Sequence, residues 1–122
     1  MEKIRIRLTV NGNSFSAVLE PGQTAEALRA RLERGDIKVR MEDYGNMEKV
    51  GGLGFSLPRH DVRTVTGPGD MVLYQGNSLV IFYGTNTWSY TPLGKVEGVS
   101  SRERMLELWG KGDDATVTLS LE

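Results

Sequence analysis

Cysteine is absent from this sequence of 122 residues, and histidine occurs once, as His60. Without cysteine the chain has no disulfides, no thiolate nucleophile and no cysteine ligands for a metal. A metal site needs several ligands, and no second histidine can join His60, so we expect neither a metal nor another cofactor. We interpret His60 as an exposed loop residue, because its neighbour Asp61 is badly placed to orient it and no nucleophile elbow is present.

Long apolar runs are also missing. No run approaches the roughly 20 residues that span a bilayer, and the charged segment 1–5 lacks the apolar core of a signal peptide. The 15 basic and 16 acidic residues are interspersed and leave a net charge of −1, so no basic stripe for nucleic acid is indicated. We therefore expect a cytoplasmic protein that binds neither membranes nor nucleic acid, folded as a single domain over residues 1–122.

Alternation of apolar and polar residues is the clearest pattern present. It runs from Ile4 to Val10 and again from Ala115 to Leu121, and a period of two is typical of a strand with one buried face. Asn11-Gly12-Asn13 follows the first of these segments and predicts a hairpin turn. Together with the helical spacing around Leu28, the pattern predicts a set of buried residues. These are Ile4, Ile6, Leu8, Phe15, Leu19, Leu28, Val39, Val72, Val80, Val96, Val117 and Leu119.

Two near-continuous apolar runs, 71–74 and 79–83, predict paired central strands that are covered on both faces. The glycine-rich segment 43–69 predicts loops with one or two short strands. Thr24 is a candidate cap for a first helix. Ser100 and Glu103 have the spacing of a capping box for a second helix, which we expect to end at Gly110.

About eight short strands, with each helix set between strands, indicate a mainly β protein. We predict a closed, mostly antiparallel barrel whose two short helices cover its ends. Closure of the barrel also removes the exposed edges that the first and last strands would otherwise present.

Four segments of the chain resemble cyclophilins. Residues 65–69 (Val-Thr-Gly-Pro-Gly) and 76–82 (Gly-Asn-Ser-Leu-Val-Ile-Phe) look like the cyclophilin turns that lead into two central strands. Residues 94–98 resemble the segment around Phe-Gly-Lys-Val, and residues 24–30 resemble the start of the first cyclophilin helix. The chain looks most like the short, uncharacterised bacterial and archaeal cyclophilin-like proteins, and the resemblance implies an eight-stranded barrel with two capping helices.

The same resemblance implies where isomerase residues would lie. Cyclophilins catalyse prolyl isomerisation with an arginine, a phenylalanine at the proline ring and a glutamine that positions the peptide. An alignment anchored on Gly51-Gly52 places Glu42, Met47 and Val50 at these three positions. A shift by two residues places Arg40 at the arginine position instead. Most of the isomerase set is absent, so we expect little or no isomerase activity, and Arg40 is the candidate catalytic residue of a divergent isomerase.

Polar residues cluster around the turn at Gly45. One interpretation is a ligand site in which Glu42 and Lys49 face each other across a groove beside Tyr44. The other, which we favour, is a solvated turn with a surface ion pair worth about 0–1 kcal/mol. The full cluster consists of Glu42, Asp43, Tyr44, Glu48 and Lys49.

Aromatic residues make up only 7% of the chain, and most of them fall in its second half. Core packing is the expected role of each, although some could line a pocket outside the barrel. Cyclophilins have a tryptophan at the pocket that holds proline, and Trp88 lies near the corresponding position. The resemblance therefore implies that Trp88 is a binding residue. The aromatic residues concerned are Tyr74, Phe82, Tyr83, Trp88 and Tyr90.

Three functions remain open. The first is a binding module that holds a small molecule or peptide in an external groove bordered by Glu42, Tyr44, Lys49 and Trp88. The second is a divergent peptidyl-prolyl isomerase that uses Arg40. The third is a protein-interaction domain with no pocket. We expect a monomer or weak dimer, because the charged helix faces leave no long apolar seam.

Overall fold

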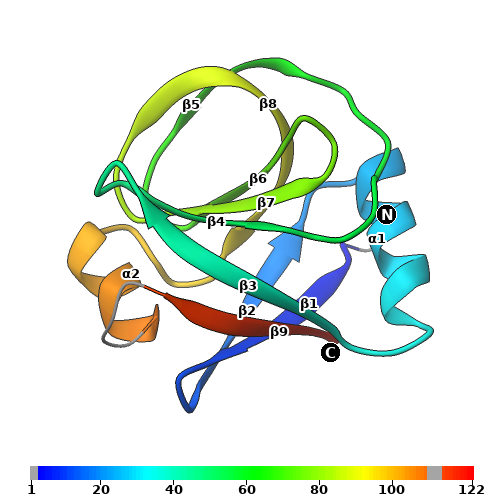
Figure 1. The fold of residues 1–122 in the computed structure, drawn as a ribbon, viewed down its shortest axis with the longest axis horizontal. Helices are drawn as coiled ribbons and strands as arrows, with labels where there is room; N and C mark the ends of the chain where they lie inside the picture. Colours follow the sequence, from blue (N-terminus) through cyan, green and yellow to red (C-terminus); the bar gives the residue numbers. More distant parts are fainter. Residues whose placement is uncertain (1–2, 110–113) are drawn as a thin grey trace.

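The structure is a computed structural model, which describes residues 3–109 and 114–122. Nine strands and two helices occur in the described residues (Figure 1). Their order and bounds are β1 (Arg5–Val10), β2 (Asn13–Leu19), α1 (Gln23–Leu32), β3 (Ile37–Tyr44), β4 (Glu48–Gly52), β5 (Val62–Thr66), β6 (Asp70–Tyr74), β7 (Ser78–Phe82), β8 (Asn86–Val96), α2 (Arg102–Trp109) and β9 (Ala115–Leu121).

The strands form one antiparallel sheet that closes on itself. Their order is β2-β1-β9-β3-β4-β7-β6-β8-β5, and an additional pairing of β2 with β8 closes a ring of eight strands. The predicted mainly β barrel is therefore confirmed. β5 is a ninth strand outside the ring, and it pairs with β8 from Val62↔Tyr90 to Thr66↔Asn86.

Ring closure depends on Gly94, which lies opposite Leu19 in the pairing of β2 with β8. A Cβ atom at Gly94 would collide with the carbonyl oxygen of Val18 and lie 2.9 Å from the Cα atom of Leu19. Only glycine lets the two backbones approach this closely. The glycine that interrupts the apolar pattern of this segment is thus the residue that allows the barrel to close.

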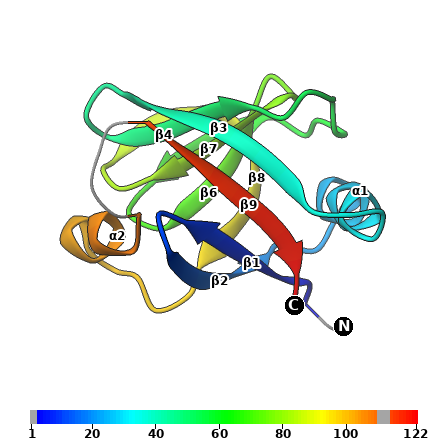
Figure 2. The ribbon, with the colours of Figure 1, turned by 60° about the horizontal axis from the view of Figure 1, so that its bottom comes forward.

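The two helices lie at opposite ends of the barrel (Figures 1 and 2). Both contribute to the inner core, α1 through Leu28 and Leu32 and α2 through Met105 and Trp109. Neither helix is long and apolar enough to cross a membrane, within the residues that the structure describes.

Both helix starts differ from the sequence prediction. The side chain of Thr24 does not cap α1; its hydroxyl donates to the carbonyl oxygen of Pro58 at 2.7 Å, and Gly22 occupies the cap position. In α2 the cap is Ser101, whose hydroxyl oxygen accepts from the backbone N–H of Arg104 at 3.2 Å. The cap therefore lies one residue later than predicted, and because residue 104 is arginine it is not a capping box. Gly110, expected at the end of this helix, lies outside the described residues.

The central strands β6 and β7 are covered on both faces, as predicted. Residues on one face, including Leu73 and Leu79, belong to the inner core. Residues on the other face form a second, smaller group, here called the outer cluster, which consists of Val72, Val80, Phe82 and Tyr90. The predicted buried residues are confirmed except Ile4, which is half-buried and packs against the core.

Candidate functional site

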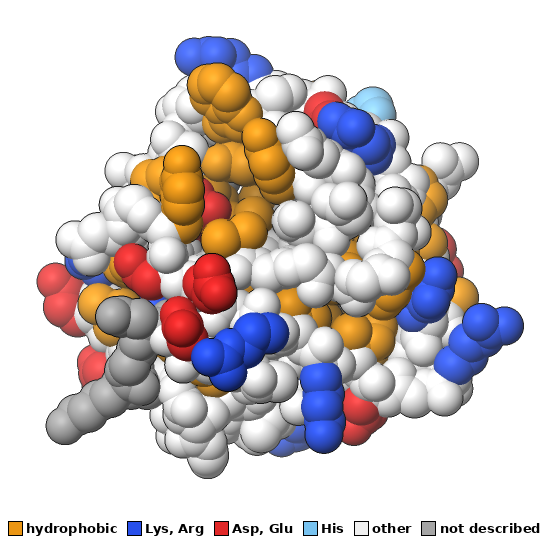
Figure 3. Space-filling view, in the orientation of Figure 1, with side chains coloured by type: hydrophobic (Ala, Val, Ile, Leu, Met, Phe, Trp, Pro, Cys, Tyr) orange, Lys and Arg blue, Asp and Glu red, His pale blue; other side chains and the backbone are white. Residues whose placement is uncertain are grey.

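A cavity of about 550 Å³, here called the outer cavity, opens beside the outer cluster. Its volume falls in the range of small-molecule sites. In Figure 3 hydrophobic side chains surround a hollow on this face, and an acidic side chain is visible inside it. The lining residues come from β3, β4, β6, β7, β8 and the β3–β4 turn. They are Tyr44, Met47, Glu48, Val50, Tyr74, Ser78, Val80, Asn86, Trp88 and Tyr90.

Strand alternation creates the wall of the outer cavity. Val80 projects outward from β7 while its neighbours Leu79 and Ile81 project into the inner core. Tyr90 covers the outward side of these strands, and its ring meets the rings of Phe82 and Tyr74 edge-on, at centroid distances of 5.7 and 6.1 Å. Such edge-to-face contacts fix ring orientation and hold the aromatic wall in place.

Two aromatic residues at the cavity are largely exposed. Tyr44, at the end of β3, is 62% exposed, and Trp88, on β8, is 56% exposed. Trp88 lies opposite Thr64 of β5, so β5 supports the segment that carries the indole. A large aromatic side chain left in water beside a cavity offers a contact surface that the fold itself does not use.

Glu48 is the acidic residue of the outer cavity. It is the first residue of β4, lies opposite Tyr44 on β3 and Phe82 on β7, and is only 6% exposed. Burial raises its pKa from 4.5 to about 7, and the nearby negative charge of Asp43 contributes to the increase. A carboxyl group with this pKa changes its charge near neutral pH, which surface glutamates do not do.

Tyr90 and Asn86 supply oriented polar groups on the β8 side of the cavity. The side-chain amide of Asn86 donates to the Tyr90 hydroxyl at 2.8 Å, so that oxygen accepts and its own hydrogen remains available to donate. Burial raises the pKa of the Tyr90 hydroxyl, an effect that the Asn86 hydrogen bond partly offsets and that the Glu48 charge reinforces. Tyr90 therefore stays a neutral donor at physiological pH.

The predicted ligand-binding residues divide between the two faces of the sheet. Tyr44 and Trp88 line the outer cavity together. Glu42 is exposed on the same strand face as Tyr44, opposite the lining residue Val50, but it is not part of the lining. Lys49 is buried on the inner face of β4, so the expected arrangement of Glu42 and Lys49 across a groove is not formed.

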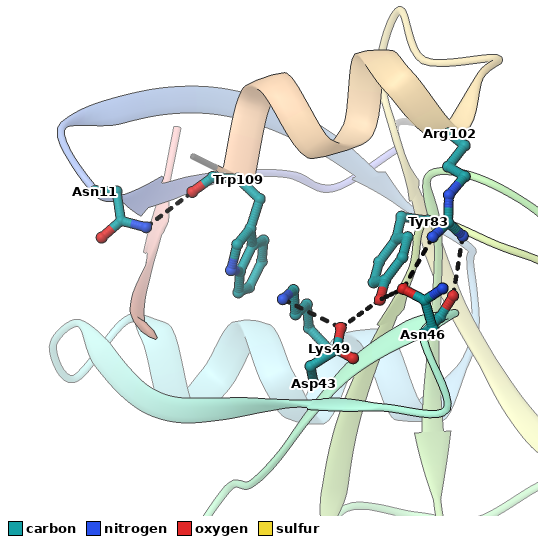
Figure 4. Close-up of polar contacts among 7 residues, drawn as sticks. All are labelled: Asn11, Asp43, Asn46, Lys49, Tyr83, Arg102 and Trp109. Atoms are coloured by element: carbon teal, nitrogen blue, oxygen red, sulfur yellow. Dashed lines mark hydrogen bonds and ion pairs between the residues drawn. The ribbon is translucent and has the colours of Figure 1, made fainter. Parts of the chain in front are cut away.

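Lys49 instead belongs to a polar network with Asp43, Asn46, Tyr83 and Arg102, in which Lys49 and Tyr83 are buried (Figure 4). Its ammonium lies 3.2 Å from the Asp43 carboxylate, which also accepts a hydrogen bond from the Tyr83 hydroxyl. Arg102 donates to the carbonyl oxygen of Asn46 at 2.9 Å and to its side-chain oxygen at 3.0 Å. The ion pair that we expected at the surface thus has a buried member, Lys49, and the network around it connects the β3–β4 turn to α2.

The pKa of Asp43 reflects this network. Burial by itself raises it, but hydrogen bonds from Tyr83 and Lys49, together with the Lys49 charge, outweigh burial and hold it below its usual value. Asp43 therefore remains ionised at neutral pH. Its charge is held beside Lys49 on the inner face, while Glu48 meets the cavity on the outer face.

Arg40 lies away from the outer cavity. Its guanidinium is 67% exposed and 3.6 Å from the Asp114 carboxylate, and it is not among the lining residues. Met47 and Val50, which the cyclophilin alignment placed at the phenylalanine and glutamine positions, do line the cavity. The described residues contain no group of three histidine or acidic side chains arranged to hold a metal ion.

Comparison with known proteins agrees with this fold. The model of a protein family described as "Cyclophilin-like family" matches residues 8–120 of the chain. No curated protein sequence matches it. Among solved structures, the fold is similar to the solution structure of the hypothetical protein AF2241 from Archaeoglobus fulgidus. The two share 16% sequence identity with a TM-score of 0.71, over 98% of this chain and 95% of that chain.

Proposed function

The chain belongs to the Cyclophilin-like family, and from that premise we propose that it is a binding module whose outer cavity holds a small molecule or a peptide side chain without isomerising it. One observation carries the proposal: a buried acid, Glu48, lies in a cavity bordered by two exposed aromatic residues, Tyr44 and Trp88. An apolar cavity with a few convergent polar groups is the usual form of a ligand site.

The residue types at the cavity support binding rather than isomerisation. Prolyl rotation is accelerated by a cationic donor beside the twisted amide. The described lining contains no lysine or arginine, and Met47 and Val50 stand where the alignment expects phenylalanine and glutamine. The arginine that the sequence offered for this role, Arg40, lies 3.6 Å from Asp114 and outside the lining.

A fragment screen by protein NMR tests whether the cavity binds ligands. We expect fragments to shift amide signals of β4, β7 and β8 in the native protein. Val50→Trp should abolish these shifts, because an indole at this lining position fills the cavity from its β4 wall. The matched control is Val65→Trp on β5, where the native side chain is 77% exposed and outside the lining. Fragments that bind both variants equally would contradict the proposal.

A protease-coupled assay on a proline peptide tests the absence of catalysis. We expect the isomerisation rate to equal the uncatalysed rate. Turnover that Arg40→Ala abolishes would overturn the proposal in favour of a divergent isomerase.

A further inference from the structure

The outer cavity carries charge of one sign only. Of the described residues that line it, Glu48 is the single ionisable acid, and none is lysine, arginine or histidine. Lys49 forms an ion pair with Asp43 and Arg102 donates to Asn46, and neither basic residue is part of the lining. When Glu48 ionises, no cation of the described lining balances it, so the cavity becomes a negatively charged, largely apolar space.

Aromatic rings dominate the same lining. Tyr44, Tyr74, Trp88 and Tyr90 supply four rings from three different strands. The face of an aromatic ring carries partial negative charge, and several rings around one space attract an organic cation and accept its alkyl groups at the same time. Rings and carboxylate therefore favour the same kind of ligand.

Resting on the proposed function, we propose that the ligand is a small organic cation, whose alkylammonium group lies beside Glu48 and contacts the rings of Tyr44, Tyr74, Trp88 and Tyr90. The alkyl substituents meet the apolar surface, and the positive charge meets the one acid.

Other charge classes fit the cavity less well. An anion would meet Glu48 without any basic residue of the described lining to compensate. A divalent metal ion requires several oxygen or nitrogen ligands, whereas this lining offers one carboxylate among aromatic and aliphatic side chains. An alkylammonium ion is weakly hydrated and loses less on leaving water, which suits a cavity of this composition.

Cation binding in this cavity must be linked to a proton. The titratable groups that line the cavity together with Glu48 are Tyr44 from β3, Tyr74 from β6 and Tyr90 from β8. Asp43 of β3 and Lys49 of β4 lie on the other side of the sheet, where they form an ion pair with each other at 3.2 Å. None of the groups in the lining is a cation, so the bound ammonium is the partner that favours the ionised carboxylate. With the Glu48 pKa near 7, affinity should rise about tenfold between about pH 6 and about pH 8.

Titration calorimetry with choline tests the inference. The matched probe is dimethylbutanol, in which carbon replaces the quaternary nitrogen, so the two molecules share a shape and differ in charge. At about pH 8 we expect choline to bind at least about tenfold more tightly than the neutral probe. We also expect proton release on binding at about pH 7, seen as a difference in heat between buffers of different ionisation enthalpy.

Variants assign the effect to residues. Glu48→Gln should remove the preference for choline, its pH dependence and the proton release. Glu26→Gln, an exposed acid on α1, should retain all three. A capped peptide with one trimethyllysine, titrated in parallel, distinguishes a free cation from a cationic side chain by which of the two binds more tightly.

Two results would overturn the inference. Equal binding of choline and dimethylbutanol would show that the cavity selects shape and not charge, and the proposed binding function would stand. Absence of choline binding, while the NMR screen finds neutral fragments in the cavity, would also refute the cation and leave the binding function in place. If neither choline nor any fragment binds, both the inference and the proposed function fail.

Discussion

Replacement of Glu48 by glutamine should change how stability depends on pH. The folded-state pKa of about 7 lies above the unfolded value of 4.5, so the folded protein retains a proton that the unfolded chain has released. The protonated Glu48 side chain therefore makes its full contribution to stability below about pH 4.5, and this contribution is lost as the pH rises toward about 7. The two pKa values correspond to a loss of about 3 kcal/mol, and the steepest part approaches about 1.4 kcal/mol per pH unit. Such a loss is a large share of the stability of a typical domain.

The measurement is urea unfolding of the native protein and of Glu48→Gln at several pH values between about 4.5 and 8. As the pH rises across this range, we expect the free energy of unfolding of Glu48→Gln to increase by about 3 kcal/mol relative to that of the native protein. Asp43 does not confound the comparison: its pKa is lowered, so its contribution is lost only below about pH 3.8. Glu26→Gln is the control, since this acid is exposed on α1. Parallel stability curves for the native protein and Glu48→Gln would refute the assignment of a buried, protonated carboxyl group.

Three further predictions concern the fold. Leu119→Ala should cost about 2–5 kcal/mol in urea unfolding, because Leu119 is fully buried in β9, whereas Leu121→Ala, at a position 37% exposed, should cost much less; equal costs would mean that β9 is misplaced. Gly51→Ala should cost about 1–3 kcal/mol, because its Cβ would collide with a backbone carbonyl of β3, while Gly52→Ala has open space and should be near neutral by the same measurement. Lys49→Ala should lower stability by about 2–3 kcal/mol, because the Asp43 carboxylate would lose its charged partner; an unchanged melting temperature would instead indicate a surface ion pair and contradict the burial of Lys49.

The barrel could be predicted from sequence because its pattern is local. Alternation in β1 and β9 identifies which residues face the core, and the apolar runs of β6 and β7 indicate burial on both faces. Helix caps were less predictable. Ser100 and Ser101 are both acceptable capping residues by type, and the structure has Ser101 as the cap.

The candidate site could be predicted only in part. Tyr44 and Trp88 were identified, but Glu48 and Lys49 were interpreted as members of one exposed cluster. Recognising β4 as a strand would have separated them, since adjacent strand residues point to opposite faces. Burial of Glu48 was not visible in the sequence, because Tyr90, which packs on this side of the sheet, comes from β8, a strand that is distant along the chain.

The alternation of β6 and β7 has a genetic consequence. Inward residues such as Leu73 and Leu79 hold the barrel together, while outward residues such as Val80 form the wall of the cavity. Under the proposed function, a saturating mutational scan over residues 78–81 of β7 should record two alternating phenotypes: altered ligand preference at the lining positions Ser78 and Val80, and loss of abundance at the core positions Leu79 and Ile81. Selection on the proposed function can thereby change ligand preference through the lining positions while the core positions keep the barrel intact.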